Sequence, residues 1–337
     1  MQVAWESPPF GIDDLEPGAA EGYQSPASPL RKDREVRCCI RDCRTWLPRR
    51  TRRETPKFCP DHGISTSTSP TYVYKDWRRN ILLQRDLMAR VKEHKFESWR
   101  LGNESSEDAL SWNVFVGLAY LGGLREAFEV LTGLTAREEP QLFFWGVEVW
   151  PAYRSGVWLQ LAEAQAYFEK GVDIQTEPDI MLRVAGQALV LVEAKFGSPN
   201  GTLAKKTTKK KPCVSIPDFL NRYRPIPGRA DPLDRNAMMA LSREQVLEQL
   251  CRNVVFSNRL VESNEKGFVA NLVRGTAETD VKERMDRHLS TEARAKFRRV
   301  TWEDLSCLHS LQRDKASLLR QYLRTKTLNL QGAFKMA

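Results

Sequence analysis

Three ionisable residues stand at or inside two apolar runs, DIMLRV and ALVLVEAKF, in the segment 176–197. They are Asp179, Glu193 and Lys195, and charges inside buried strands are costly unless something offsets the cost. If the runs form a hairpin with its turn centred on Gly186, Asp179 and Glu193 are each seven residues from the turn and face one another. Glu193 and Lys195 are two residues apart and project from the same face of a strand. The pattern therefore predicts that the three side chains converge.

Two carboxylates side by side repel each other unless a proton or a cation lies between them. Hard divalent ions such as Mg²⁺ or Mn²⁺ favour oxygen ligands and keep open positions for water and phosphate. A lysine beside the carboxylates can hold the attacking water or take a proton from it. Asp179, Glu193 and Lys195 thus suit in-line hydrolysis of a phosphodiester. Glu177 is a second acid that could replace or assist Asp179.

Pro178-Asp179 and Glu193-Ala194-Lys195 resemble the two halves of the PD-(D/E)xK motif of the restriction-endonuclease-like nucleases. The resemblance implies a central mixed β-sheet flanked by helices. It also implies that Asp179, Glu193 and the Ala194 backbone carbonyl bind the metal, and that Lys195 orients or activates water. The same triplet occurs on ordinary helix surfaces as a solvated ion pair, but the apolar run before Glu193 disfavours a helix surface.

Two further segments extend this resemblance. The segment 107–115, EDALSWNVF, is similar to the acidic N-terminal core helix of the superfamily, which would turn Glu107 toward the metal. The segment 248–256, EQLCRNVVF, is similar to the Gln-bearing helix that follows the lysine, which would turn Gln249 inward and let Arg252 meet a phosphate. Ordinary surface or core polar roles remain the alternative for Glu107 and Gln249.

A second kind of chemistry is indicated by Cys39-x3-Cys43 and Cys59-x2-His62, two ligand pairs separated by fifteen residues. Two such pairs clamp one tetrahedral Zn²⁺ in compact ribbons and fingers. Four protein ligands leave no position for water, so a zinc ion here would be structural. Cys38 competes with Cys39 for one position, and the cysteines could instead be free thiols.

Basic residues surround both candidate sites. The loop between the two ligand pairs is rich in arginine and contains Trp46, and a lysine run follows the predicted catalytic strand. Such residues suit phosphate contacts and base stacking, although solvated basic loops have the same composition. The expected nucleic-acid contacts are Arg49, Arg50, Arg52, Arg53, Lys205, Lys206 and Arg252.

The elements that must position these residues follow from hydrophobic periodicity. We expect helices over 76–97, from Ser105 or Ser106 through EDALSWNVFVGLAYL, and over 158–170, before the hairpin. The Pro-, Lys- and Gly-rich stretch 198–234 predicts no regular structure, and the chain from Ser242 looks helical to near its end. The expected fold class is α/β, with a restriction-endonuclease-like core, extra helices and a small zinc module.

Composition divides the 337 residues into three parts. Residues 1–34 form a poorly ordered arm, residues 35–65 a zinc-binding module, and residues 71–337 the nuclease domain with a C-terminal helical region. STSTSP at 65–70 reads as the linker between the last two.

The formal charge of +9 favours a polyanionic partner. No apolar run is long enough to span a membrane, and the N-terminus lacks the pattern of a secretory signal, so we expect a cytoplasmic protein. The combined pattern predicts a Mg²⁺-dependent deoxyribonuclease, an endonuclease of restriction or phage defence. Its expected partner is DNA, with a homo-oligomer or an accessory defence protein as further candidates. The alternatives are a ribonuclease and a non-catalytic nucleic-acid-binding or assembly protein on a nuclease scaffold.

Overall fold

The computed structural model describes residues 35–40, 42–49, 55–67, 71–94, 99–171, 175–204, 214–328 and 331–334. The expected N-terminal arm, residues 1–34, lies outside them. Contacts divide the chain into two units. One, which we call the sheet unit, holds Leu124–Leu305, and the other, the terminal unit, holds the described residues before and after that range. The range 71–337, which we expected as one domain, is thus distributed over both units.

A six-stranded mixed sheet forms the centre of the sheet unit, in the order β10-β9-β8-β7-β5-β6. The strands are β5 (Gln141–Phe144), β6 (Val147–Trp150), β7 (Ile180–Val184), β8 (Ala188–Ala194), β9 (Lys266–Val273) and β10 (Phe297–Thr301). β6, β5, β7 and β8 pair antiparallel in succession, whereas β8, β9 and β10 run parallel. The predicted α/β class with a central mixed sheet flanked by helices is confirmed.

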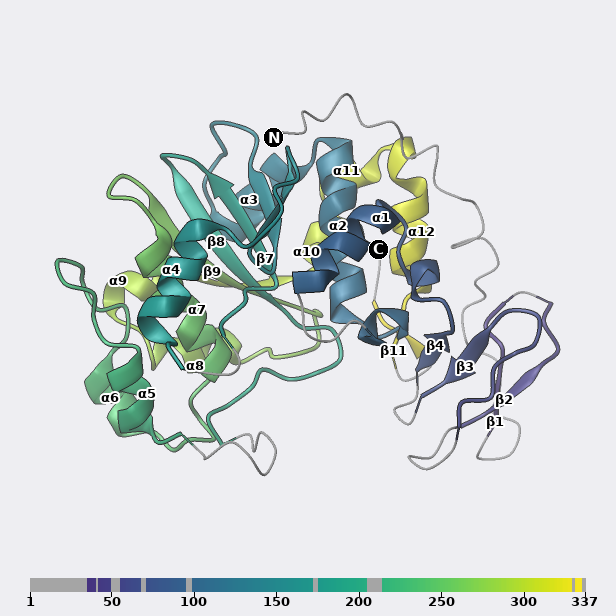
Figure 1. Cartoon of the computed structure of the whole chain (residues 1–337), viewed down its shortest axis with the longest axis horizontal. Helices are drawn as coiled ribbons and strands as arrows, with labels where there is room; N and C mark the ends of the chain where they lie inside the picture. The colour runs from purple at the N-terminus through teal and green to yellow at the C-terminus, as the bar shows by residue number, and fades with distance from the viewer. Residues whose placement is uncertain are drawn as a thin grey trace. The chain divides into compact units, whose positions relative to one another are not determined.

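β8 lies in the middle of this sheet and is buried at every position. Its residues Leu189 and Leu191 belong to the same core cluster as Leu250 and Val254 of α7 (Glu248–Leu260). Figure 1 shows α7 beside β8 and β9, with α4 (Leu159–Phe168) packed against α7. Because side chains alternate along a strand, Glu193 shares the face of Leu189 and Leu191 that α7 covers.

The predicted hairpin is confirmed. Ile180 pairs with Val192 and Val184 with Ala188, so the register is centred on Gly186. Gly186 has φ +69°, the left-handed backbone that a tight turn needs and that glycine adopts without cost. The helix expected over 158–170 is also present, as α4.

The prediction of a helical C-terminal part is wrong for two segments, because β9 and β10 are strands. A fully buried parallel strand has an almost unbroken apolar run, here FVANLV in β9, and such a run has no period that separates strand from helix. The stretch 198–234 is not wholly irregular either, because α5 (Ile216–Arg222) lies within it. Its N-cap Ser215 accepts a hydrogen bond from the Asp218 N–H.

The remaining helices of the sheet unit are short, apart from α3 (Leu124–Thr132), which contacts β8, β9 and β10. They are α6 (Arg235–Met239), α8 (Val281–Asp286), α9 (Thr291–Arg294) and α10 (Trp302–Ser306), whose last residue falls in the terminal unit. No helix in the described part of the chain is long and apolar enough to cross a lipid bilayer.

The terminal unit begins with two small antiparallel pairs, β1 (Glu35–Arg37) with β2 (Trp46–Pro48) and β3 (Ile64–Thr66) with β4 (Tyr72–Tyr74). Ser65 and Thr66 belong to β3, so the expected linker at 65–70 does not begin at residue 65. Because β3 pairs with β4, the small N-terminal module extends beyond residue 65. Residues 68–70 lie outside the described residues.

The helices of the terminal unit follow. The helix expected over 76–97 is broken into η3 (Trp77–Asn80), α1 (Arg85–Val91) and η4 (Lys92–His94), and residues 95–97 are not described. The Leu82 N–H donates to Asn113 Oδ1 at 2.8 Å instead of to a helical carbonyl, which stabilises the break. α2 (Glu107–Leu121) forms as predicted, with Ser106 as its N-cap. The other elements are η5 (Trp99–Gly102), α11 (His309–Gln312), η6 (Asp314–Ala316), α12 (Ser317–Thr325), β11 (Thr327–Leu328) and β12 (Gln331–Gly332).

Candidate active site and candidate metal centre

The hairpin of β7 and β8 places Asp179 opposite Glu193. Asp179 directly precedes β7, and the register that pairs Ile180 with Val192 leads in one further step to Asp179 and Glu193. Asp179 Oδ2 accepts a hydrogen bond from the Ala194 N–H at 2.9 Å. The predicted meeting of Asp179 and Glu193 across the strands thus follows from the observed register.

Glu193 is buried, and protein donors engage both of its carboxylate oxygens. Lys195 Nζ lies 2.7 Å from Glu193 Oε1 in a buried ion pair. Asn253 Nδ2 of α7 donates to Glu193 Oε2 at 3.1 Å. A buried carboxylate without such partners would carry a large desolvation cost, and the contacts with Lys195 and Asn253 offset it.

The backbone after Glu193 is held by β9 and by the residues that follow β9 and β10. The Lys195 N–H donates to the Leu272 carbonyl of β9 at 2.8 Å, and Trp302 Nε1 donates to the Lys195 carbonyl at 3.1 Å. Arg274 Nε donates to the Phe196 carbonyl at 2.8 Å. These contacts fix the end of β8 and so the direction in which the Lys195 side chain leaves it.

A chain of buried amides continues from Glu193 into the loops. Asn271 of β9 donates through Nδ2 to the Glu193 carbonyl at 3.1 Å and accepts through Oδ1 from Asn200 Nδ2 at 2.9 Å. Asn200 Nδ2 also donates to Glu278 Oε2 at 3.1 Å. An asparagine in the middle of a buried strand is costly unless its amide is paired, and here the pairing connects Glu193 to two loops.

Sequence analysis missed Asn253 and Asn271 as members of this cluster. Gln249, the residue that we expected to face inward from α7, is half-buried and lies against Gly201. Asn253 is one helical turn after Gln249 and contacts Glu193 instead. In the sequence, Asn253 could have been found as a polar residue on the apolar face of α7. Asn271 could have been found as a polar residue inside the apolar run FVANLV.

Arg252, next to Asn253, has a structural partner. Its Nη1 lies 3.9 Å from Oε1 of Glu169, a carboxylate that also accepts from the Thr176 N–H at 2.5 Å and the Tyr223 hydroxyl at 2.6 Å. Burial alone would lower the pKa of Arg252, but neighbouring ionisable groups, Tyr223 foremost and Glu193 among them, raise it above its usual value. Arg252 therefore stays charged, and its expected contact with a phosphate stays a prediction.

The other expected residues are placed as follows. Glu107 opens α2 in the terminal unit, so its expected place at the metal stays a prediction. Glu177 is exposed and Arg49 is half-buried. Five expected contact residues lie outside the described residues, namely Arg50, Arg52, Arg53, Lys205 and Lys206.

A second cluster lies in the terminal unit, where four ligand side chains approach each other within 4.8 Å: Cys38, Cys43, Cys59 and His62. Cys59 Sγ lies 3.4 Å from His62 Nδ1, and Cys43 Sγ lies 3.7 Å from Cys59 Sγ. Three sulfurs and one imidazole nitrogen match the donor set of a closed tetrahedral site. The cluster could hold a metal ion such as zinc.

Cys38 takes the position that we assigned to Cys39, so that assignment is corrected. β1 ends at Arg37, and in the bend that follows it is Cys38 whose Sγ lies with those of Cys43 and Cys59. Hydrogen bonding with the Cys39 thiol, and then with the Ile40 backbone and the other two thiols, lowers the pKa of Cys38 to about 5 against the effect of burial. The thiolate, which binds metals, is the form thus favoured.

Within the described residues no other group of three or more histidine, cysteine or acidic side chains is close enough to share a metal ion. Asp179 and Glu193 form a pair of carboxylates and not a complete protein cage.

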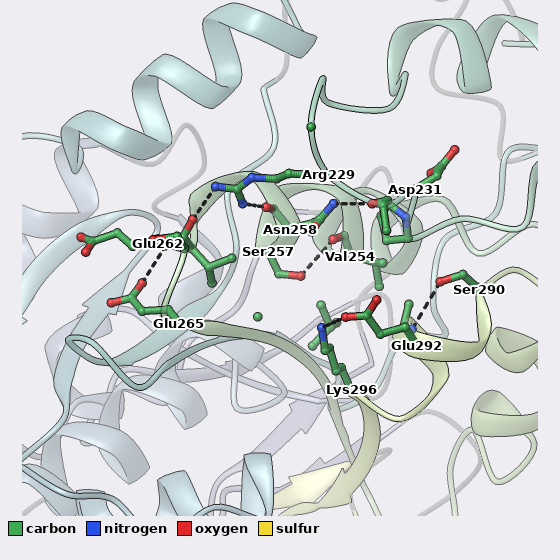
Figure 2. A pocket seen from close by; sticks show the side chains of 18 residues that line it. Arg229, Asp231, Val254, Ser257, Asn258, Glu262, Glu265, Ser290, Glu292 and Lys296 are labelled. Atoms are coloured by element: carbon green, nitrogen blue, oxygen red, sulfur yellow. Dashed lines mark hydrogen bonds and ion pairs between the residues drawn. The ribbon is translucent and has the colours of Figure 1, made fainter.

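The sheet unit also contains a pocket of about 420 Å³, shown in Figure 2. It is lined by the last turns of α7, the start of β9, the loop around Arg229 and the region of α9. Gly267 and Val269 bring β9 into the pocket at the strand's N-terminal half, whereas Asn271, opposite Glu193, lies further along. The pocket contains none of the predicted site residues, so we do not place the chemistry there.

Compared with protein-family models, curated proteins and solved structures, the chain matches none of them. The restriction-endonuclease-like family therefore stays a proposal, to be argued from the residues of this chain.

Proposed function

We propose that this protein is a metal-dependent nuclease that hydrolyses phosphodiester bonds of DNA. The observation that carries the proposal is the buried ion pair between Lys195 Nζ and Glu193 Oε1 at 2.7 Å. The register of the β7–β8 hairpin leads to Asp179 opposite Glu193, and Asp179 Oδ2 accepts from the Ala194 N–H. Two carboxylates and a lysine where the central strands β7 and β8 meet their loops form a costly arrangement that stability alone does not require.

The donor set fits a hard divalent cation. Asp179 and Glu193 offer carboxylate oxygens, and the Ala194 carbonyl is the further ligand that the superfamily resemblance suggests. With only two acidic residues, the coordination sphere would keep positions for water and for phosphate oxygens. When bound, Mg²⁺ or Mn²⁺ would neutralise charge on the phosphate and make a bound water more acidic.

The chain's own residues have separate tasks in this proposal. The Lys195 ammonium donates to Glu193 Oε1 at 2.7 Å, and its task in this proposal is to orient or activate the attacking water. Asn253 keeps the Glu193 carboxylate in place from the opposite side. Ala194 fixes Asp179 through its N–H. Because Glu193 and Lys195 are buried, charges there act more strongly than they would in water.

We propose that the sheet unit has a restriction-endonuclease-like core. The mixed sheet puts the two motif halves on adjacent antiparallel strands, and α7 follows the lysine strand and packs on its site face. We propose an endonuclease of restriction or phage defence acting on DNA in the cytoplasm, alone, as a homo-oligomer or with an accessory protein.

We further propose that Cys38, Cys43, Cys59 and His62 bind one structural Zn²⁺. The carrying observation is the convergence of their four ligand atoms within 4.8 Å. These four ligands fill a tetrahedral shell, so the ion would stabilise the small β-pairs and take no part in hydrolysis.

The nuclease proposal is tested with purified protein on linear, circular and single-stranded DNA and on RNA, with Mg²⁺, with Mn²⁺ or with EDTA. We expect cleavage of at least one DNA substrate with added metal and none with EDTA. Lys195→Ala should abolish cleavage, whereas Lys266→Ala, at an exposed lysine on the neighbouring strand β9, should cut like the wild type. Cleavage of RNA alone would reassign the substrate, and no cleavage by the wild type would reject the nuclease.

A further inference from the structure

A tyrosine on the surface of the sheet unit has two guanidinium groups near its ring. Tyr167, near the C-terminal end of α4, is 39% exposed, whereas most large hydrophobic residues of this unit are buried. Arg224 Cζ lies 5.6 Å and Arg259 Cζ 5.9 Å from the centroid of the Tyr167 ring. Cations at this distance are attracted to an aromatic ring. We call Tyr167, Arg224 and Arg259 the Tyr167 patch.

The ring of Tyr167 has a firm support. Phe168, its buried neighbour, meets it edge to face at 4.8 Å between centroids. Phe168 in turn packs against Tyr223 and Phe256 at 5.9 and 5.4 Å. Tyr167 is thus a rigid, partly exposed aromatic platform on the core of the sheet unit, and a flat ligand could stack on it at little entropic cost.

The positive charge of the Tyr167 patch is not neutralised locally. Among the described residues, neither Arg224 nor Arg259 has an acidic partner within ion-pair distance, and the same holds for the exposed neighbours Lys170 and Arg222. Burial and then the charge of Arg259 lower the pKa of Arg229, which indicates like charges close together. The acid on the same side of α4, Glu163, is one turn before Tyr167.

The Tyr167 patch is connected to the candidate active site through α7. Arg252, one residue before Asn253, and Arg259 are seven residues apart, which is two helical turns and about 10 Å along the same side of the helix. Asn253 contacts Glu193, so about two helical turns of α7 separate the contact with this carboxylate from Arg259. α4 and α7 pack together, which keeps this distance fixed.

We infer that the Tyr167 patch binds a single-stranded segment of nucleic acid, with one base stacked on Tyr167 and its phosphates beside Arg224 and Arg259. An aromatic platform beside cations is the chemistry by which proteins bind single strands without reading their sequence. Duplex bases are already stacked on one another and cannot use the ring. The inference rests on the proposed function only where it identifies the bound strand as part of the nuclease substrate.

Binding is measured with fluorescent single-stranded dT and U oligonucleotides, a DNA duplex, and an abasic deoxyribose-phosphate strand of equal length. The full-length protein is used without added divalent metal, and the oligonucleotides are checked for integrity. We expect the base-bearing single strands to bind more tightly than the abasic strand. Tyr167→Ala should weaken their binding about tenfold and remove the preference over the abasic strand, while Tyr167→Phe should retain both.

Charge is tested in the same assay. Each single-strand phosphate contact contributes about 0.7 to the slope of log affinity against log salt, so Arg224→Gln should lower the slope by about that amount. Arg137→Gln is the matched control, since Arg137 is exposed and lies by the turn of the β7–β8 hairpin, at the end away from Glu193.

Equal binding by wild type and Tyr167→Ala with unchanged thermal unfolding would overturn the inference. So would equal competition by polyglutamate, which would point to an acidic peptide. These outcomes are separate from the nuclease proposal. If the protein binds single strands through Tyr167 but cuts no substrate, this inference holds and the nuclease proposal is rejected. If the protein cuts DNA but binds equally well without Tyr167, the nuclease proposal holds and this inference is rejected.

Discussion

The contact of Asn253 with Glu193 leads to a prediction that does not depend on the charged residues of the motif. Asn253 is buried, and its Nδ2 donates to Glu193 Oε2 at 3.1 Å. Asn253→Leu keeps the size of the side chain but removes the donor, so one carboxylate oxygen of Glu193 is left without its partner. We expect a loss of both stability and activity.

The magnitude follows from the kind of hydrogen bond. Hydrogen bonds to charged groups contribute about 1.5–3 kcal/mol, so Asn253→Leu should lower the free energy of unfolding by about 2 kcal/mol. Groups that orient a metal ligand typically change metal affinity or activity by about 10- to 100-fold when removed. We therefore expect a similar rise in the Mg²⁺ concentration needed for half-maximal cleavage, since Glu193 is the proposed ligand.

The assay combines urea unfolding with a Mg²⁺ titration of the cleavage rate. Gln249→Leu is the matched control, because Gln249 lies one turn earlier on α7 and is half-buried against Gly201. It should change the Mg²⁺ dependence little. If Asn253→Leu unfolds and titrates like the wild type, or if Gln249→Leu has the larger effect on the titration, the assignment of Asn253 as the positioning residue is wrong.

Three further predictions concern the zinc site, a buried lysine and the hairpin turn. Cys38→Ser should lose bound zinc and melt at a lower temperature, whereas Cys39→Ser should keep the metal. Elemental analysis of both variants measures the zinc, and zinc retained by Cys38→Ser would refute the ligand set. Burial lowers the pKa of Lys326, which lies 3.7 Å from Glu104, to about 8 from 10.5. The unfolded chain therefore binds more protons between these values, and the terminal unit should gain about 2 kcal/mol of stability between pH 8 and 9.5. Urea unfolding across that range should show the gain in the wild type and not in Lys326→Met, and a flat wild-type profile would contradict it. Gly186→Ala should lower the free energy of unfolding by about 1–2 kcal/mol, since φ is +69°; Gly186→Asn should cost less, and equal costs in urea unfolding would argue against backbone strain as the cause.

The hairpin and the pairing across it could be predicted because the relevant information is local. The turn residue Gly186 and the two apolar runs fix a register that is symmetric about the turn, and register decides which residues meet. The N-cap Ser106 could be predicted for the same reason, since a cap depends only on its own backbone and that of the next turn.

The missed parts depend on contacts between distant segments. β9 is a strand because β8 and β10 pair with it on both sides, and its own apolar run is equally compatible with a buried helix. The choice between Cys38 and Cys39 depends on which of two adjacent side chains faces the second ligand pair, about twenty residues away in the chain. Asn253 could not be chosen over Gln249 because both lie on one side of α7, and packing against β8 decides the inward turn.

The most direct test of the central claim compares two neighbouring acids on the DNA substrate that the wild type cuts. Asp179→Asn keeps the shape of the side chain and removes one proposed metal ligand, and Glu177→Gln makes the same change at an exposed acid two residues earlier. We expect the Mg²⁺-dependent cleavage rate to fall by at least about a hundredfold in Asp179→Asn and to stay near the wild-type value in Glu177→Gln. Undiminished cleavage by a folded Asp179→Asn protein would contradict the proposed active site.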